Sequence, residues 1–188
     1  MEKITFATGN AGKLAEAQAL MPRIHLVGLS VDFEEPRSND LTLIAREKLR
    51  QAKKMVNGSC FVMDTGFYIE ALNGFPGSYV NFALGTIGVE GILKLMQGVS
   101  NRRCAFRQCL AYFDGSREHL FYAENPGSLS LDSIGSDCAQ QWSGLWHIFI
   151  PEGENKTLSA FTQDQLEERR RKGNGTLKQL AAFLKVEE

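Results

Sequence analysis

Short strand-like runs alternate with helical periodicity over the first third of the chain, and this alternation restricts the fold more than any other feature. Residues 3–8, 24–29 and 60–63 are β-branched, aromatic or otherwise apolar runs of strand length. Between them lie two segments, 11–21 and 41–56, in which apolar residues recur at helical spacing. Strands that alternate with helices are typical of the α/β class. The sequence therefore predicts an α/β fold.

The rest of the chain adds a β-hairpin to this pattern. We expect strands at 103–113 and 119–124, joined by the turn Asp114-Gly115-Ser116. The remaining expected elements are a helix at 86–96, a short strand at 149–151 and a largely helical segment at 163–184. Because the early strands alternate with helices and the later pair forms a hairpin, the sheet should be mixed. No linker or repeat interrupts residues 1–188, which favours a single domain.

The charge balance excludes several classes of partner. Lys and Arg number 21 against 22 Asp and Glu, for a net charge of -1, so the chain lacks the overall basic footprint of a nucleic-acid or anionic-membrane binder. The apolar runs are too short to span a bilayer, and the N-terminus does not resemble a secretory signal. Four scattered cysteines show no CxxC pair. We expect a cytoplasmic protein with reduced thiols and no zinc site.

The turn between the first strand and the first helix is the first candidate for chemistry. It reads Thr8-Gly9-Asn10-Ala11-Gly12-Lys13. The glycines permit close backbone approach, the helix N-terminus offers N–H groups, and Lys13 adds a positive charge, which together suit a phosphate. It matches neither the Walker A pattern nor the GxGxxG fingerprint. A turn that only caps the helix is the alternative, and the residues alone leave both open.

Asp64 is the second candidate, because it follows a buried apolar run. We expect it at the carboxyl end of its strand, where open α/β sheets place ligands, with Thr65-Gly66 as the start of a turn. Together with Glu35 it could hold Mg²⁺, which commonly takes one or two carboxylates and substrate phosphates. The alternative is that Asp64 caps the turn after it.

Three further features allow two interpretations each. Lys48 lies at the border of an apolar helix face, either as a side chain on the rim of the core or as a partly buried cation directed at a phosphate. The basic run 169–172 is either a solvated helix face or the source of one or two ligand contacts. Trp142 and Trp146 are either core residues or a platform for a stacked base.

Together these segments resemble the inosine triphosphate pyrophosphatase family, above all its archaeal branch. FATGNAGKLAEAQ is similar to the family's [T/S]-x-N-x-x-K turn, and IAREKLRQA carries Lys48 at the family's lysine. VMDTGFYIEALNGFPGSYV resembles the central signature, with Asp64 on the catalytic acid. TIGVEGILKLM, NRRCAF and IFIPEGENKT follow in family order, so the resemblance covers about residues 3–184.

The resemblance implies a fold and a reaction. The fold would be a long mixed sheet flanked by helices, with two lobes around a cleft, in a homodimer. The reaction would be Mg²⁺-dependent hydrolysis of ITP, dITP or XTP to the monophosphate and pyrophosphate. The implied phosphate-binding residues are Thr8, Gly9, Asn10, Ala11, Gly12, Lys13, Lys48 and Thr65. Glu35 and Asp64 are the implied metal ligands, Glu34 is a weaker candidate, and Asp64 is also the candidate for activating water.

The chain departs from the family at the residues that read the base. Trp142-Ser143-Gly144-Leu145-Trp146-His147 stands where the family has Gly-Phe-Gly-Tyr-Asp-Pro, and basic residues replace the family's Ser-His-Arg triplet. Met63 replaces a second acid. The candidates for the nucleobase pocket are Gly144, Trp146, Arg171 and Lys172. These changes leave an alternative open, namely a divergent paralogue with another substrate or with nucleotide binding but no turnover.

Overall fold

The computed structural model describes residues 3–136 and 141–184. The chain forms two compact units, which are described separately below. Unit 1 comprises residues 1–65, 108–123 and 174–188, and unit 2 comprises residues 66–107 and 124–173. Whether these units act as the single domain expected from the sequence stays a prediction.

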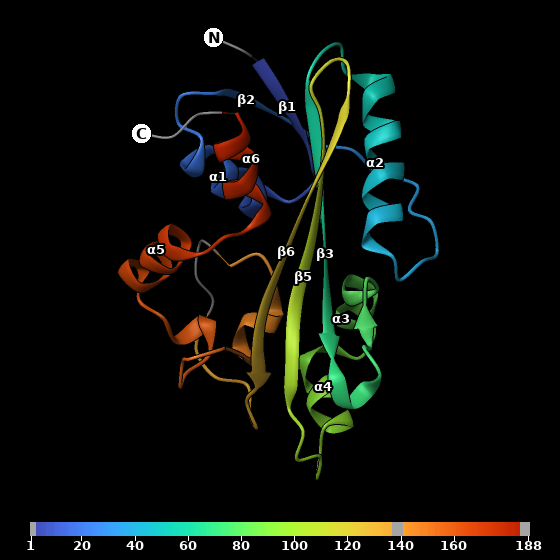
Figure 1. Cartoon of the computed structure of the whole chain (residues 1–188). Coiled ribbons are helices and arrows are strands. Elements are labelled where there is room, and N and C mark those ends of the chain that lie inside the picture. The colour runs from blue at the N-terminus through green and yellow to red at the C-terminus, as the bar shows by residue number, and fades with distance from the viewer. Residues whose placement is uncertain (1–2, 137–140, 185–188) are drawn as a thin grey trace. The chain divides into compact units, whose positions relative to one another are not determined.

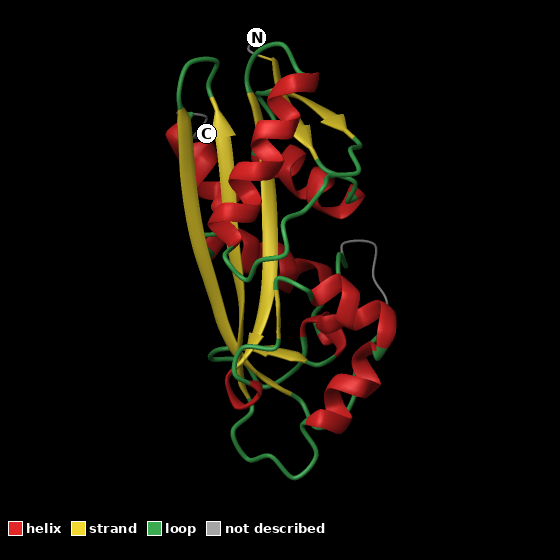
Figure 2. Cartoon of the chain, turned by 90° about the vertical axis from the view of Figure 1, so that its right-hand side faces the viewer, coloured by secondary structure: helices red, strands yellow, loops and turns green. Residues whose placement is uncertain are grey.

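A mixed seven-stranded sheet runs in the order β2-β1-β3-β5-β6-β7, with β4 paired to β3. Strands β1 and β2 are parallel, as are β1 and β3, whereas β3–β4 and β6–β7 are antiparallel. Its strands are β1 Lys3–Ala7, β2 His25–Leu29, β3 Cys60–Ile69, β4 Pro76–Gly77, β5 Arg103–Phe113, β6 Glu118–Leu129 and β7 Phe149–Pro151. The three longest, β3, β5 and β6, are neighbours in the sheet (Figures 1 and 2). The expected mixed α/β class is confirmed.

The helices of the described residues are short or of medium length. They are α1 Ala11–Leu20, α2 Leu41–Met55, α3 Val80–Thr86, α4 Gly88–Leu95, α5 Gln163–Lys172 and α6 Thr176–Phe183. Three 3₁₀ turns are η1 Glu70–Leu72, η2 Gly144–His147 and η3 Leu158–Ala160. Among the described residues, none of the helices has the length and apolar character needed to traverse a bilayer.

In unit 1 the alternation of side chains along β3 builds two separate apolar layers. Phe61 and Met63 pack with residues of α1 and α6, and Phe61 stacks on Phe6 of β1 with ring centroids 4.2 Å apart. Cys60 and Val62 point the other way and pack against α2. Figure 1 shows α1 and α6 on one side of these strands and α2 on the other. Since successive strand residues face opposite sides, adjacent residues of β3 face different helices.

The core of unit 2 is mainly aromatic. Phe67, Phe106 and Phe149 meet at tilted or edge-to-face angles, with centroids 4.7 to 6.0 Å apart. Ile92 of α4 and Leu166 of α5 pack against this cluster. Edge-to-face rings fill the space between a sheet and its helices with favourable quadrupole contacts.

Two strands are longer than the sequence predicts, and one of these differences moves a candidate residue. Asp64 does not end β3, which continues to Ile69, so the expected turn at Thr65-Gly66 is wrong. Gly66 is extended strand instead, and its missing side chain matters: a Cβ there would lie 2.9 Å from the Gly77 carbonyl oxygen of β4. Glycine thus permits close backbone approach in this strand. Similarly, β6 continues to Leu129 and pairs with β7.

The helices differ from expectation at one place. Helix α3 was not expected, and the helix predicted from residue 86 begins only at Gly88, whose φ of +66° separates α4 from α3. The pattern over α3 is weak because only Ala83 is buried, while Phe82 is 71% exposed. The predicted helical segment 163–184 is confirmed as α5 and α6.

Candidate active site

The loop from β1 into α1 is a compact turn held by its own side chains. The backbone N–H of Asn10 donates to the Thr8 hydroxyl at 3.1 Å. The Asn10 side chain then accepts the Lys13 backbone N–H at 3.0 Å, so that Asn10 is the N-cap of α1. Ala11 and Gly12 begin the helix. First-turn N–H groups lack intrahelical acceptors and carry the positive end of the helix dipole, which suits an anion.

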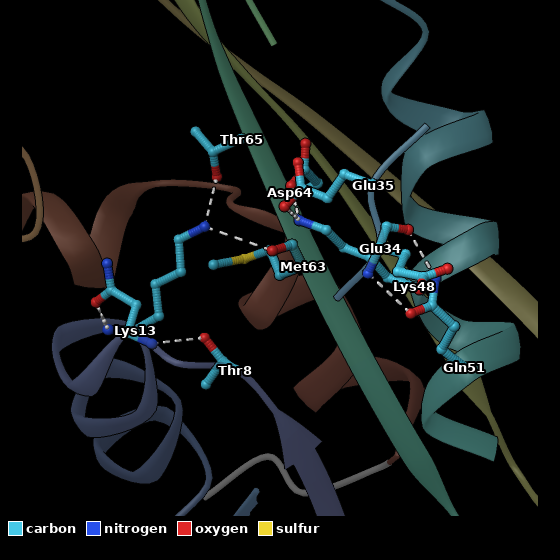
Figure 3. A network of polar contacts seen from close by, with 10 residues as sticks. Thr8, Lys13, Glu34, Glu35, Lys48, Gln51, Met63, Asp64 and Thr65 are labelled. Atoms are coloured by element: carbon cyan, nitrogen blue, oxygen red, sulfur yellow. Dashed lines mark hydrogen bonds and ion pairs between the residues drawn. The ribbon is translucent and has the colours of Figure 1, made fainter. Parts of the chain in front are cut away.

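Lys13 directs its ammonium group from this turn toward β3. Its Nζ lies 3.3 Å from the Thr65 hydroxyl and 3.4 Å from the Met63 carbonyl oxygen, two neutral acceptors at long distances (Figure 3). Burial lowers the pKa of Lys13 from 10.5 to about 8, partly offset by the negative charge of Asp64. Lys13 is therefore a poorly compensated cation, which an incoming anion would stabilise in its charged form.

Helix α2 carries the second lysine on its buried face. Asp40 caps the helix by accepting the backbone N–H of Thr42 at 2.8 Å. Ala45, Leu49 and Ala52 are completely buried on the side that packs against β3 and β5. Lys48 shares this side and is only 8% exposed. A lysine is rarely buried to this extent unless it has ionic partners.

Lys48 has two such partners, both of them carboxylates. Its Nζ lies 2.5 Å from Asp64 Oδ1 and 2.7 Å from Glu35 Oε1. The side chains of Lys48 and Asp64 are about nine-tenths buried, whereas that of Glu35 is 51% exposed. Burial alone would lower the pKa of Lys48, but the two carboxylates outweigh it and raise the pKa above its ordinary value. Lys48 is therefore a fully charged, paired cation.

The loop that carries Glu35 is fastened to α2 by Gln51. The Gln51 side chain accepts the backbone N–H of Glu34 at 3.0 Å and donates to the Glu34 carbonyl oxygen at 2.8 Å. Phe33 packs against the apolar layer beside α2, with the Lys48 Nζ 5.9 Å from its ring centroid. Glu34 thus contributes its backbone N–H and carbonyl oxygen to these two hydrogen bonds. They hold the loop that carries Glu35 against α2. Gln51 was not singled out from the sequence, although it lies one turn after Lys48.

Strand β3 brings these groups together on its two faces. Asp64 faces α2 and Lys48, whereas Met63 and Thr65 face Lys13 (Figure 3). Met63 is 7% exposed, and its sulfur accepts a hydrogen bond from the Thr176 hydroxyl of α6 at 3.2 Å. Met63, at the position where the resemblance implies a second acid, thus lies in the apolar layer with α1 and α6 and accepts one hydrogen bond. Three consecutive residues of β3, Met63 to Thr65, thus make polar contacts with the two lysines.

The Glu35–Asp64 pair has the composition of a partial magnesium site. Both carboxylates already converge on one cationic nitrogen, and carboxylate oxygens are the ligands that Mg²⁺ prefers. Within the described residues no group of three His, Cys, Asp or Glu side chains could hold a metal ion. Two carboxylates fit Mg²⁺ when water and substrate phosphate complete its coordination.

The candidates for the nucleobase pocket all belong to unit 2. Gly144 begins η2, and Trp146 is 7% exposed within the aromatic core, 6.0 Å from Trp142 between ring centroids. Arg171 is exposed, and Lys172 pairs with Glu168 at 2.7 Å on the surface of α5. Arg169 of the same run is half-buried and donates to the Asn125 side chain.

Two buried polar atoms beside η2 were not anticipated from the sequence. Gln141 Oε1 and Trp146 Nε1 lack a hydrogen-bond partner within the described part of the chain. The Gln141 amide nitrogen lies 3.2 Å from His147 Nε2, and the other ring nitrogen of His147 lies 3.3 Å from the Ile134 carbonyl oxygen. Gln141 is thus oriented by its contact with His147. Buried polar atoms are normally satisfied, so an acceptor and a donor left over here are suited to a ligand.

The cysteines take no part in this arrangement. Cys60, Cys104 and Cys109 are free and buried, while Cys138 lies outside the described residues. Burial raises the pKa of the Cys104 thiol to about 12 and that of Cys109 to about 11. Thiols with such pKa values are poor nucleophiles at neutral pH.

Comparison with known proteins shows which proteins this chain is similar to. A model of the Ham1 family matches residues 4–182. A dITP/XTP pyrophosphatase of Thermococcus kodakarensis is 33% identical over 97% of both chains. The protein of the same name from Methanopyrus kandleri is 38% identical over 84% of this chain and 83% of its own length.

Solved structures agree with the fold. The structure of the Staphylococcus aureus Ham1 protein has a TM-score of 0.81 at 24% identity and full coverage of both chains. A HAM1 protein from Coxiella burnetii has a TM-score of 0.82 at 22% identity, covering 98% of this chain and 99% of its own. At these identities the similarity establishes the fold.

Proposed function

The chain belongs to the Ham1 family, and from this premise we propose that it hydrolyses purine nucleoside triphosphates that carry a non-standard base. ITP, dITP and XTP are the expected substrates, and the nucleoside monophosphate and pyrophosphate are the products. The names of the dITP/XTP pyrophosphatase relatives support this substrate class.

The observation that carries the proposal is the pair of lysines on the two faces of β3. Lys13, with the N-terminus of α1, offers a poorly compensated positive charge, and Lys48 lies with two carboxylates on the other face. A polyphosphate brings several negative charges together, and its hydrolysis depends mainly on charge stabilisation and positioning. Both lysines and both carboxylates belong to unit 1.

In the reaction, water attacks the α-phosphorus, the bond to the bridging oxygen breaks, and pyrophosphate leaves. We assign the leaving phosphates to Lys13, Lys48, Thr65 and the turn of residues 8–12. Of the two carboxylates paired with Lys48, Asp64 is the buried one, and it lies on β3. It would orient the water through its carboxylate oxygens and receive the released proton, or serve as a metal ligand.

Glu35 and Asp64 would hold Mg²⁺. When bound, the ion would neutralise part of the phosphate charge and hold the phosphates in position. Gln51 supports this role, because its two hydrogen bonds hold the Glu34 backbone and thereby restrain the backbone of the next residue, Glu35.

The nucleobase would bind beside η2. Gln141 Oε1 can accept a hydrogen bond and Trp146 Nε1 can donate one, which is the pairing that a keto base with a ring N–H requires. Gly144 begins the same turn and remains a candidate for the base site. Arg171 and Lys172 remain candidates for contacts to the ligand, although Lys172 is paired with Glu168.

The remaining assignments extend what the sequence and its resemblance to the family lead us to expect. We propose that residues 1–188 act as one domain, that the protein is a cytoplasmic homodimer, and that neither nucleic acid nor a membrane is a partner.

Pyrophosphate release from ITP, dITP, XTP, dUTP, ATP and GTP in the presence of Mg²⁺ tests the proposal. Asp64→Asn should lower the rate about 10²- to 10⁴-fold without changing the circular dichroism spectrum. Asp164→Asn, at an exposed carboxylate of α5, is the matched control and should retain activity. Wild-type rates in Asp64→Asn would refute the catalytic assignment. Nucleotide binding without release would favour the non-catalytic paralogue.

A further inference from the structure

The contact between Lys48 and the two carboxylates has a consequence for the order in which ligands bind. Lys48 Nζ directly contacts one oxygen of Asp64 and one of Glu35. These are the same two side chains that would hold a divalent cation. The ammonium group and the metal ion would therefore compete for the same two carboxylates.

The charges of this cluster set the direction of the competition. Two carboxylates and one ammonium leave a net charge of one negative unit. A metal ion that entered without other change would place its charge next to the buried cation, and this like-charge contact would be strongly unfavourable. Lys48 therefore has to leave the carboxylates before the metal ion can take both of them.

Lys48 cannot leave without another anion. Its side chain is only 10% exposed, and a buried charge that loses its partner is strongly destabilising. The phosphates of a nucleotide or of pyrophosphate are the anions that the proposed reaction brings to the site. Since only two carboxylates are available, the same phosphates also complete the coordination that the described residues leave incomplete.

We propose that Lys48 is a positioning residue that occupies the Glu35–Asp64 pair in the free protein and thereby makes divalent-cation binding and polyphosphate binding mutually dependent. This inference rests on the proposed function. Lys48 moves from the carboxylates to the phosphate as the metal–phosphate complex binds. The protein consequently binds the metal weakly by itself and binds it tightly together with the phosphate, and thermodynamic reciprocity requires the same factor in both directions.

The test measures Mn²⁺ binding by electron paramagnetic resonance, without nucleotide and without turnover. We expect Lys48→Met to bind Mn²⁺ alone at least tenfold more tightly than the wild type, because the competing cation is gone. Lys54→Met, an exposed lysine of the same helix, is the matched control and should equal the wild type. Lys48→Arg keeps the charge and should keep the weak affinity.

The second measurement adds inorganic pyrophosphate. In the wild type it should raise Mn²⁺ affinity at least tenfold, and in Lys48→Met by a smaller factor. Equal or weaker Mn²⁺ binding by Lys48→Met would overturn the inference. If that variant does not fold by circular dichroism, Lys48→Gln replaces it. The absence of an effect of pyrophosphate on the wild type would overturn the inference without any variant. Failure of the proposed function would appear separately, as no pyrophosphate release from the nucleotide panel.

Discussion

Lys13 should make anion binding dependent on pH in a range where few lysines titrate. Burial holds the pKa of Lys13 at about 8 in the free protein. A bound phosphate favours the charged form, so binding above this pH requires uptake of a proton. Below pH 8 the dissociation constant should not change because of Lys13. One unit above it, only about a tenth of Lys13 is charged, and affinity should fall by up to tenfold per pH unit.

The assay is isothermal titration calorimetry of pyrophosphate with Mg²⁺ between pH 6.5 and 9.5, in two buffers of different ionisation enthalpy. Lys13→Arg is the control, because a guanidinium stays charged throughout this range. The ionisation of pyrophosphate itself is common to both proteins and cancels in the comparison. Identical pH profiles for wild type and Lys13→Arg, or no proton uptake by the wild type at pH 8.5, would refute the assignment.

The lowered pKa of Lys13 also makes the stability of the protein depend on pH. The direction is opposite to that of a lysine whose pKa is raised by an ion pair. The folded-state pKa lies below the ordinary value of 10.5, so the unfolded chain binds more protons between pH 8 and 10.5. Stability contributed by this group therefore rises with pH across that window. At pH 7 the charged Lys13 costs at most about 3 kcal/mol, and Lys13→Met should melt at a higher temperature while binding pyrophosphate more weakly. A lower melting temperature would contradict this.

Two further predictions concern residues that support the site. Gly66→Ala should destabilise the protein by about 1–3 kcal/mol, because its Cβ would lie 2.9 Å from the Gly77 carbonyl oxygen. Thermal melts measure this loss. Gly85→Ala is the control, since a Cβ at Gly85 would meet no atom within 4 Å. In Gln51→Ala, the factor by which Mg²⁺ raises pyrophosphate affinity should be about tenfold smaller than in the wild type. Calorimetry measures this factor, with Gln18→Ala, at an exposed position, as the control. An unchanged factor would show that the Glu35 loop does not need the Gln51 contact.

The sequence was sufficient for local structure and for the types of residue at the site. The turn before α1 and its cap at Asn10 depend on residues that are neighbours in the chain, and they were predictable. The end of β3 was not, since Thr65-Gly66 resembles a turn until β4 is seen to pack against Gly66. Tertiary pairing decided the conformation there.

The choice of partners at the site also depended on tertiary structure. Lys48 and Asp64 were both candidates, but their direct contact depends on how α2 packs on β3. The same holds for Gln51, whose role arises only when the loop of residue 34 folds back on α2. A sequence shows which chemical groups are present, whereas the distances between these groups depend on how the helices and strands pack.

The opposite orientation of neighbouring residues in β3 limits how this segment can change in length. Deleting one residue between Cys60 and Asp64 would turn the carboxylate from Lys48 toward Lys13 and would bring the hydroxyl of Thr65 to face Lys48. Deleting two would restore the face but move the carboxylate about 6.6 Å along the strand, beyond reach of the same ammonium. Side chains in this stretch can be exchanged one at a time, but neither insertion nor deletion preserves the arrangement.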